Sequence, residues 1–158
     1  MSARKSTEKL SPEQAMEKGR RYCAYQERSH WEVRKKLLQY GLYASEAEAC
    51  LAQLIEEGFL QEMRFAEAFV GGKFRMKQWG RMKIEKKLRS HRLTPRCIDK
   101  ALNVIDEKEY RQTLKTLLIK KMSLLAKNEA QKHKAAQFAI GKGYEPELVW
   151  ETMRELEN

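Results

Sequence analysis

The chain has 158 residues, of which 42% are hydrophobic and 34% charged, and it carries a formal net charge of +10. This length suits one domain or a row of very small units, and the positive charge favours an anionic partner such as nucleic acid, a nucleoprotein complex or an acidic membrane surface. Three cysteines are too few for a disulfide framework and fit a reducing cytosol. No apolar run approaches the length of a membrane span. Residues 1–10 have no apolar core, so we expect a mobile tail there rather than a signal peptide.

Helices are predicted along the whole chain, because apolar residues recur at spacings of three, four and seven rather than two. The first start combines Ser11 as the cap, Pro12 inside the helix and Gln14 at the position that returns a hydrogen bond. Similar signals predict further starts, in chain order, at Ser29, Ser45, Thr94, Asp106, Asn128 and Glu145. Two more helices begin near Gln61 and Trp79 without good caps. About nine helices of ordinary length result, which predicts an all-α protein.

The apolar pattern also recurs at a spacing of 51 residues. Matching triplets are Val33, Ile84 and Ala135; Leu37, Leu88 and Ala139; and Leu54, Ile105 and Leu156. Such a period is typical of tandem supersecondary units, and three helices per period indicate three-helix bundles of the helix-turn-helix kind. The predicted organisation is a tail at 1–10 followed by repeats at 11–60, 61–106 and 107–158. The repeats are expected to stack into an elongated body, straight or curved.

No catalytic or metal-binding pattern stands out in the sequence. The three histidines are scattered, and no two cysteines are close enough in the chain to form a zinc motif. Cys23, Cys50 and Cys97 belong to apolar stripes or adjoin them, so we interpret them as small core residues. We therefore predict a protein without enzymatic activity, cofactor or metal.

Positive charge is concentrated in the predicted second repeat. Residues 61–106 contain 12 basic and 5 acidic residues, whereas residues 10–60 contain 7 and 8, and residues 107–158 contain 10 and 8. Since Glu85 is the only acidic residue between positions 73 and 92, partners within the helix could not neutralise this charge. Such a surface suits a line of phosphates or an acidic protein. The predicted anion-binding residues are Lys73, Arg75, Lys77, Arg81, Lys83, Lys86, Lys87, Arg89 and Arg92.

Short motifs on either side of this region resemble those of the RecX family. The motif that joins the family's first and second repeats is matched by Gly58, Phe59, Leu60, Arg64, Phe65 and Ala66, for which we expect a mainly structural role. Arg28-Ser29 with Glu32, Val33, Leu37 and Gly41 resembles the first-repeat signature, and Trp79-Gly80-Arg81 with Ile84 and Leu88 resembles the second. The family usually has an acidic pair where this chain has Gln61 and Glu62. Gln caps a helix poorly, but Glu62 still places negative charge in the first helical turn.

The resemblance implies a cytoplasmic, non-enzymatic regulator in DNA repair and the SOS response. RecX proteins bind the RecA nucleoprotein filament along its groove and usually inhibit strand exchange and ATP hydrolysis in homologous recombination. The basic residues would then contact the filament, with weaker and non-specific binding to single- and double-stranded DNA, no membrane partner and a monomeric state. Two alternatives remain open: a helix-turn-helix-like DNA-binding protein that acts without RecA, and a scaffold recognised by another acidic protein.

Overall fold

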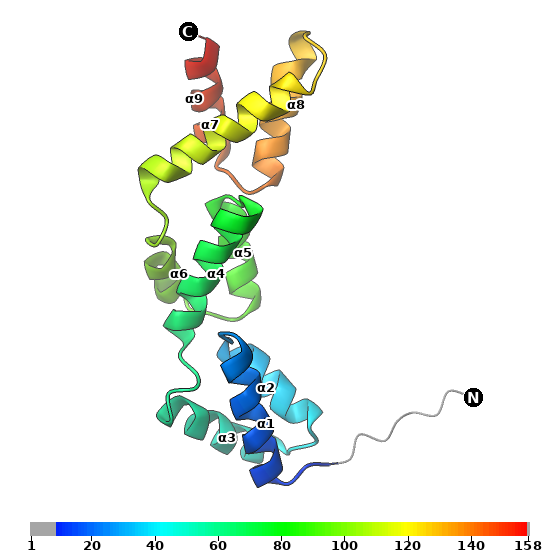
Figure 1. Ribbon diagram of the computed structural model, residues 1–158, viewed down its shortest axis with the longest axis vertical. Helices are drawn as coiled ribbons and strands as arrows, with labels where there is room; N and C mark the ends of the chain where they lie inside the picture. The colour runs from blue at the N-terminus through cyan, green and yellow to red at the C-terminus, as the bar shows by residue number, and fades with distance from the viewer. Residues whose placement is uncertain (1–8, 158) are drawn as a thin grey trace, which may run out of the picture. The chain divides into compact units, whose positions relative to one another are not determined.

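The computed structural model describes residues 9–157, apart from the side chain of Glu129, and every regular element among them is a helix (Figure 1). The predicted all-α class of repeated three-helix units is confirmed. Residues 1–8 of the predicted tail lie outside the described residues. In chain order the helices are α1 (Pro12–Tyr25), α2 (His30–Gln39), α3 (Ala44–Glu56), α4 (Glu62–Lys77), α5 (Arg81–Ser90), α6 (Pro95–Leu102), α7 (Glu107–Ser123), α8 (Glu129–Gly141) and α9 (Pro146–Glu157).

Most of the predicted helix starts are confirmed by their hydrogen bonds. Ser11 and Ser29 each form a capping box, in which the serine side chain accepts from the third backbone N–H and that residue's side chain accepts from the serine N–H. Thr94, Asp106 and Asn128 also accept from backbone N–H groups of the helices they precede. The predicted cap at Ser45 is wrong, because α3 begins earlier, with Tyr43 at the cap position. There the Glu46 carboxylate accepts the Tyr43 N–H at 2.9 Å, which satisfies that backbone donor without a serine cap.

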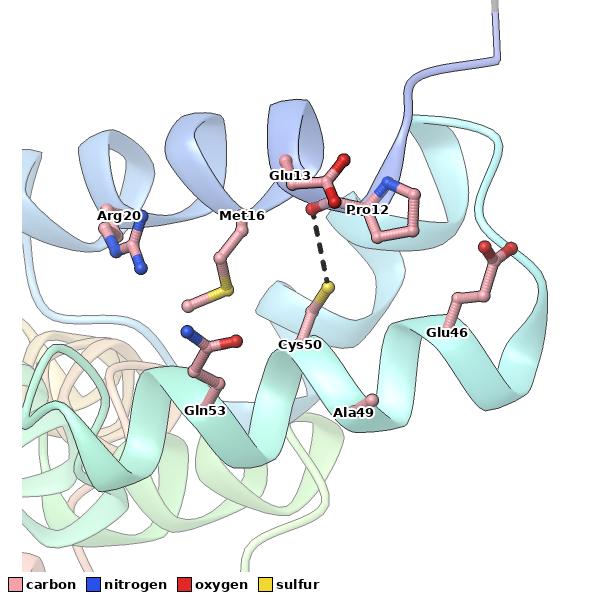
Figure 2. A pocket seen from close by; sticks show the side chains of 8 residues that line it. All are labelled: Pro12, Glu13, Met16, Arg20, Glu46, Ala49, Cys50 and Gln53. Carbon is pink, nitrogen blue, oxygen red and sulfur yellow. Dashed lines mark hydrogen bonds between the residues drawn. The ribbon is translucent and has the colours of Figure 1, made fainter.

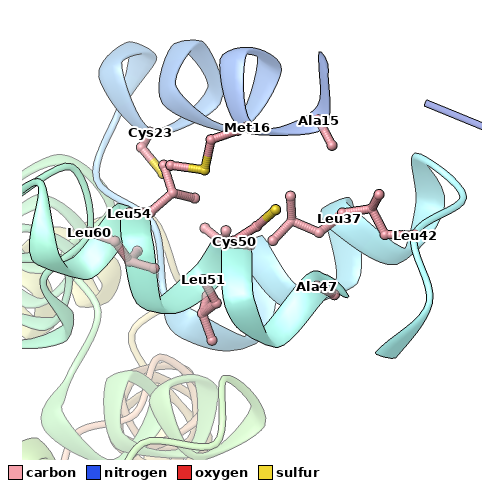
Figure 3. Packing of buried hydrophobic residues seen from close by; sticks show 11 residues of the cluster. Ala15, Met16, Cys23, Leu37, Leu42, Ala47, Cys50, Leu51, Leu54 and Leu60 are labelled. Carbon is pink, nitrogen blue, oxygen red and sulfur yellow. The ribbon is translucent and has the colours of Figure 1, made fainter. Parts of the chain in front are cut away.

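The described chain divides into two compact units, the first ending at Ala66 and the second beginning at Glu67. In the first unit, α1, α2 and α3 enclose one apolar cluster (Figure 3). Gly19 allows α1 to approach α3, because a Cβ there would lie 3.3 Å from the Leu54 Cδ1 atom. Both predicted core cysteines of this unit, Cys23 and Cys50, are buried in the cluster. The cluster contains Ala15, Met16, Cys23, Val33, Leu37, Leu42, Ala47, Cys50, Leu51, Leu54 and Leu60.

In the second unit, the beginning of α5 is capped by the turn between α8 and α9. The Gly80 N–H donates to the Lys142 carbonyl at 2.8 Å, and the Met82 N–H donates to the Gly143 carbonyl at 2.9 Å. The backbones approach so closely that a Cβ on Gly80 would overlap the carbonyl group of Gly143. Gly143 also has a φ of +102°, which favours glycine. The two glycines therefore join the second three-helix repeat to the third through their main chains, and we call this contact the glycine junction.

A partly buried polar network lies beside the glycine junction. The Tyr110 hydroxyl accepts the Arg81 backbone N–H at 3.0 Å and donates to the Glu145 carboxylate. The Arg81 guanidinium donates to Glu145 Oε2 at 2.6 Å and to Glu107 Oε2 at 2.7 Å. Tyr144 packs against Tyr110, with 5.0 Å between ring centroids, and its hydroxyl donates to the Gln78 carbonyl at 2.9 Å. Because Tyr110 and Tyr144 are fully buried, these bonds satisfy two hydroxyl groups that water cannot reach.

Replacing Gly80 with alanine should open the glycine junction. The added methyl group meets backbone atoms that cannot rotate away, so we expect the free energy of unfolding of Gly80→Ala to fall by about 1–3 kcal/mol. Gly72→Ala is the matched control, since a Cβ at this α4 position meets nothing within 4 Å and should stabilise the helix by about 0.5–1 kcal/mol. Urea unfolding followed by circular dichroism measures both. Equal effects of the two substitutions would contradict the close approach.

Removing the Tyr110 hydroxyl should also destabilise the second unit. Tyr110→Phe leaves the Arg81 N–H and one Glu145 oxygen without this partner, so we expect a loss of about 1–3 kcal/mol in the free energy of unfolding. Tyr25→Phe serves as the control, because Tyr25 is 83% exposed and its hydroxyl can bond to water in either state. The same urea titration compares the pair, and an unchanged midpoint for Tyr110→Phe would rule out a stabilising role for the network.

Candidate functional site

Exposed lysines occupy one face of α5. Ile84 and Leu88, one turn apart, are fully buried and fix the orientation of this helix. Lys83 is followed at spacings of three and four residues by Lys86 and Lys87, so the three side chains are neighbours on the helix surface. All three are exposed, and none of them pairs with a carboxylate among the described side chains. We call these residues the lysine face; their charge is available to an external anion.

The two arginines of α5 are held by carboxylates instead. Arg89 pairs with Glu85 one turn away, at 2.6 Å between Nη2 and Oε1. Arg81 belongs to the partly buried polar network, where burial opposes its charge but the hydrogen bonds to Glu145 and Glu107 raise its pKa above the ordinary value. The same bonds with Arg81 hold the pKa of the Glu107 carboxyl below its usual range. Of the predicted anion-binding residues, Arg81 therefore stabilises the fold, and Arg89 has a neutralising neighbour.

The remaining predicted residues lie at the two ends of α5. Lys73, Arg75 and Lys77 belong to the last turns of α4, and the latter two are exposed. The Lys73 and Lys83 ammonium groups lie over the Trp79 ring, 5.0 and 4.5 Å from its centroid. The structure thus brings Lys73 together with the lysine face at Trp79. Arg92 follows the other end of α5, which is about 15 Å from the first residue of that helix along its axis. Its side chain is exposed, and its backbone has a φ of +61°.

Lys142 adds a charge to this region that the sequence did not predict. Its pKa is lowered, first because the side chain is partly buried and then because Lys83 and Lys77 repel its positive charge. These three lysines come from α4, α5 and the end of α8, and the glycine junction brings them together. The sequence shows only a basic helix end, Gly141-Lys142-Gly143, so its contribution to the positive region depends on tertiary contacts.

The residues of the joining motif form a helix end and part of the core. Gly58, at a φ of +79°, ends α3, and the Phe59 N–H returns to the Leu54 carbonyl at 3.0 Å. Arg64 donates to the Gly58 and Phe59 carbonyls at 3.0 and 3.3 Å and pairs with Glu27 at 2.7 Å. Three further motif residues, Leu60, Phe65 and Ala66, are buried. All these contacts are structural, since they fix the turn between α3 and α4.

The departure from the family pattern at Gln61 and Glu62 has a visible consequence. Gln61 is exposed and precedes the first residue of α4. Glu62 is the first residue of α4, and its carboxylate accepts the His30 backbone N–H at 3.3 Å. Since His30 begins α2, the carboxylate satisfies an N–H group at a helix start, where no partner exists within the helix. In this chain Glu62 therefore connects α4 to the beginning of α2.

A hollow of about 390 Å³ lies between α1 and α3 in the first unit (Figure 2). Glu13, Arg20 and Glu46 give its walls mixed charge, and Met16 and Cys50 add sulfur atoms. The Cys50 thiol faces the Pro12 carbonyl, 3.9 Å away. Burial and the nearby Glu46 carboxylate both raise its pKa, so the reactive thiolate is disfavoured. This hollow therefore offers neither an anion site nor an activated nucleophile.

Metal sites and membrane spans do not occur in the described part of the chain. No group of three or more His, Cys, Asp or Glu side chains there is arranged to hold a metal ion. None of the described helices combines the length and hydropathy needed to cross a membrane. The candidate functional surface is the set of exposed lysines on α5.

Comparison with known proteins gives consistent matches. The family model of the first three-helix domain of RecX matches residues 15–54, and that of the second matches residues 62–102. Regulatory protein RecX of Clostridium tetani is 30% identical over 131 residues, which cover 80% of this chain but only 58% of that protein. Regulatory protein RecX of Trichlorobacter lovleyi is 29% identical over 121 residues, covering 74% of this chain and 79% of the relative.

Two solved structures share the fold. A crystal structure of regulatory protein RecX aligns with a TM-score of 0.81 at 20% identity, over 91% of this chain and 71% of the other. The crystal structure of RecX from Lactobacillus salivarius aligns with a TM-score of 0.82 at 19% identity, over 92% of this chain and 96% of the other. The lysine face lies inside the segment matched by the second RecX domain. From the two family models and the named relatives, we conclude that this chain belongs to the RecX family of regulatory proteins.

Proposed function

We propose that this protein regulates the RecA recombinase by binding the RecA nucleoprotein filament through the lysine face and the cations near it. The observation that carries the proposal is the set of exposed ammonium groups on α5, which have no carboxylate partner among the described residues. A filament presents both DNA phosphates and protein surface, and phosphates that bind lysines release condensed counterions. Membership of the RecX family supports the choice of partner.

Inhibition of the filament would follow from occupation of its groove. A protein built of repeated three-helix units can contact successive RecA subunits, and several weak contacts on one chain reinforce one another. A protein lying in the groove would block docking of a second DNA and restrict the subunit movements that accompany ATP hydrolysis. In this proposal the protein has no catalysis of its own and acts in the cytoplasm as a monomer.

A DNA-binding protein that acts without RecA is the second candidate function. The helix-turn-helix-like units and the unneutralised lysines of α5 would also suit bare DNA, where phosphate contacts dominate the affinity. The two candidates differ in which substrate binds more tightly. The filament proposal requires preference for RecA-coated DNA, whereas the alternative requires tight binding to DNA alone.

Reversing the charge of the lysine face should weaken inhibition of RecA. We expect the variant with Lys83, Lys86 and Lys87 each changed to Glu to need at least about tenfold more protein for half-inhibition of DNA-dependent ATP hydrolysis, because attraction to three phosphates becomes repulsion. The control changes Lys108, Lys115 and Lys134 to Glu; these residues are also exposed, and every one of the six reversals lowers the net charge of +10 by the same amount. Equal weakening in both variants would show that net charge, and not the lysine face, determines binding.

RecA-coated DNA should bind more tightly than bare DNA. We expect at least about tenfold higher affinity for the filament, since binding to RecA itself adds to binding of the phosphates. Fluorescence anisotropy on one labelled oligonucleotide, with and without RecA and a non-hydrolysable ATP analogue, measures both affinities. Replacing Lys83, Lys86 and Lys87 with Ala should also flatten the salt dependence on duplex DNA, by about 0.9 in log–log slope for each phosphate that is no longer neutralised. Equal affinities for the two substrates would favour the DNA-binding alternative.

A further inference from the structure

We infer that the third repeat carries a binding site for single-stranded DNA, in which one base stacks on Phe138 and lysines of α7 and α8 hold the flanking phosphates. The inference deepens the proposed function, on which it rests for a partner that carries DNA. It concerns a part of the chain outside both matched RecX domains, which end at residue 102. Because the site would bind DNA directly, binding of bare DNA in the absence of RecA tests the inference.

The site is a hollow of about 380 Å³ between α7, α8 and the end of α4. Leu117 and Phe138 supply its apolar surface, and Lys120, Lys121 and Lys142 supply its charge. Pockets of this volume lie near the lower end of the range for small ligands, which suits one nucleotide rather than a folded partner. No carboxylate is among the described residues that line it. The charged side chains that an anion would contact there are therefore all lysines.

The Phe138 ring is accessible and flanked by positive charge. The side chain is 37% exposed, although Phe is a large apolar residue. The Lys121 and Lys142 ammonium groups lie 4.6 and 5.7 Å from its ring centroid. Such cation–ring attractions are weak at exposed positions, so the lysines can turn to a phosphate while a base takes the ring face. An aromatic platform between two cations is the arrangement that single-strand-binding proteins use.

A strand fits this surface better than a free nucleotide, because the arrangement occurs twice. Trp79 is a second ring flanked by two lysines, Lys73 and Lys83. Lys142 belongs to the Phe138 hollow, and the adjacent Gly143 lies against Lys83, since a Cβ on Gly143 would be 2.4 Å from the Lys83 Cβ. Partial burial and then the charges of Lys83 and Lys77 lower the pKa of Lys142. Positive charge is thus continuous from one ring to the other. A single strand repeats base and phosphate along its length, whereas a mononucleotide could occupy only one of the two positions.

The test measures binding of a short fluorescein-labelled oligodeoxythymidylate by anisotropy. We expect Phe138→Leu, which keeps an apolar side chain but removes the ring, to weaken binding about tenfold. Phe138→Tyr, which keeps a ring, should retain the wild-type affinity. Ile119→Ala is the matched control, because Ile119, on α7, is an exposed apolar residue as Phe138 is but does not line the hollow. Circular dichroism confirms that each variant is folded.

Three results would overturn the inference. They are an unchanged affinity for Phe138→Leu, equal weakening by Phe138→Tyr, and complete displacement of the oligonucleotide by free ATP or polyglutamate at matched charge, which would assign the hollow to another occupant. RecA ATPase assays run in parallel separate the two proposals. If inhibition is absent while the Phe138 dependence persists, only the proposed function fails. If inhibition persists while oligonucleotide binding is independent of Phe138, only the single-strand site fails.

Discussion

The glycine junction determines where the functional groups of the second unit lie. Gly80 occupies the N-cap position of helix α5 and has no side chain to accept the unpaired N–H groups of the first turn. Carbonyls of Lys142 and Gly143 and the hydroxyl of Tyr110 accept them instead. The helix start is therefore complete only when the third repeat is folded against it. Because α5 carries the lysine face, the position of these charges depends on main-chain bonds between residues far apart in the chain.

This dependence explains which features the sequence could predict. Caps such as Ser11, Ser29 and Asp106 act on N–H groups three residues away, so their chemistry is readable locally, and the structure confirms them. The 51-residue spacing likewise reports a repeated apolar face. The cap of α5 could not be predicted, because its acceptors are main-chain carbonyls of another repeat, and main-chain groups leave no signature in composition. The start of α3 was misplaced because the Glu46 carboxylate bonds the backbone of Tyr43, a residue that is no usual cap.

The basic residues of the candidate site show the same limit of local prediction. In the sequence Arg81 and Lys83 look alike, as members of one basic run. In the structure Arg81 bonds two carboxylates and a tyrosine ring faces its guanidinium, whereas Lys83 remains exposed. The planar guanidinium suits several fixed acceptors at once, while the ammonium group of lysine is strongly hydrated and stays in water. Within a basic run, the choice of arginine or lysine therefore helps to predict which cations stabilise the fold and which stay exposed, and a count of charges does not.

Folding and anion binding are linked at Lys142. The bonds that cap α5 also hold Lys142 near Lys83 and Lys77, and partial burial together with repulsion from these two lysines lowers the pKa of Lys142. Like charges held together in the native state cost stability, and in the unfolded chain they would separate. An anion bound among them would offset that cost and, since it binds the folded state alone, would stabilise the second unit by mass action. The glycine junction thus does more than join two repeats: it maintains a concentration of positive charge whose repulsion a phosphate-bearing strand would relieve.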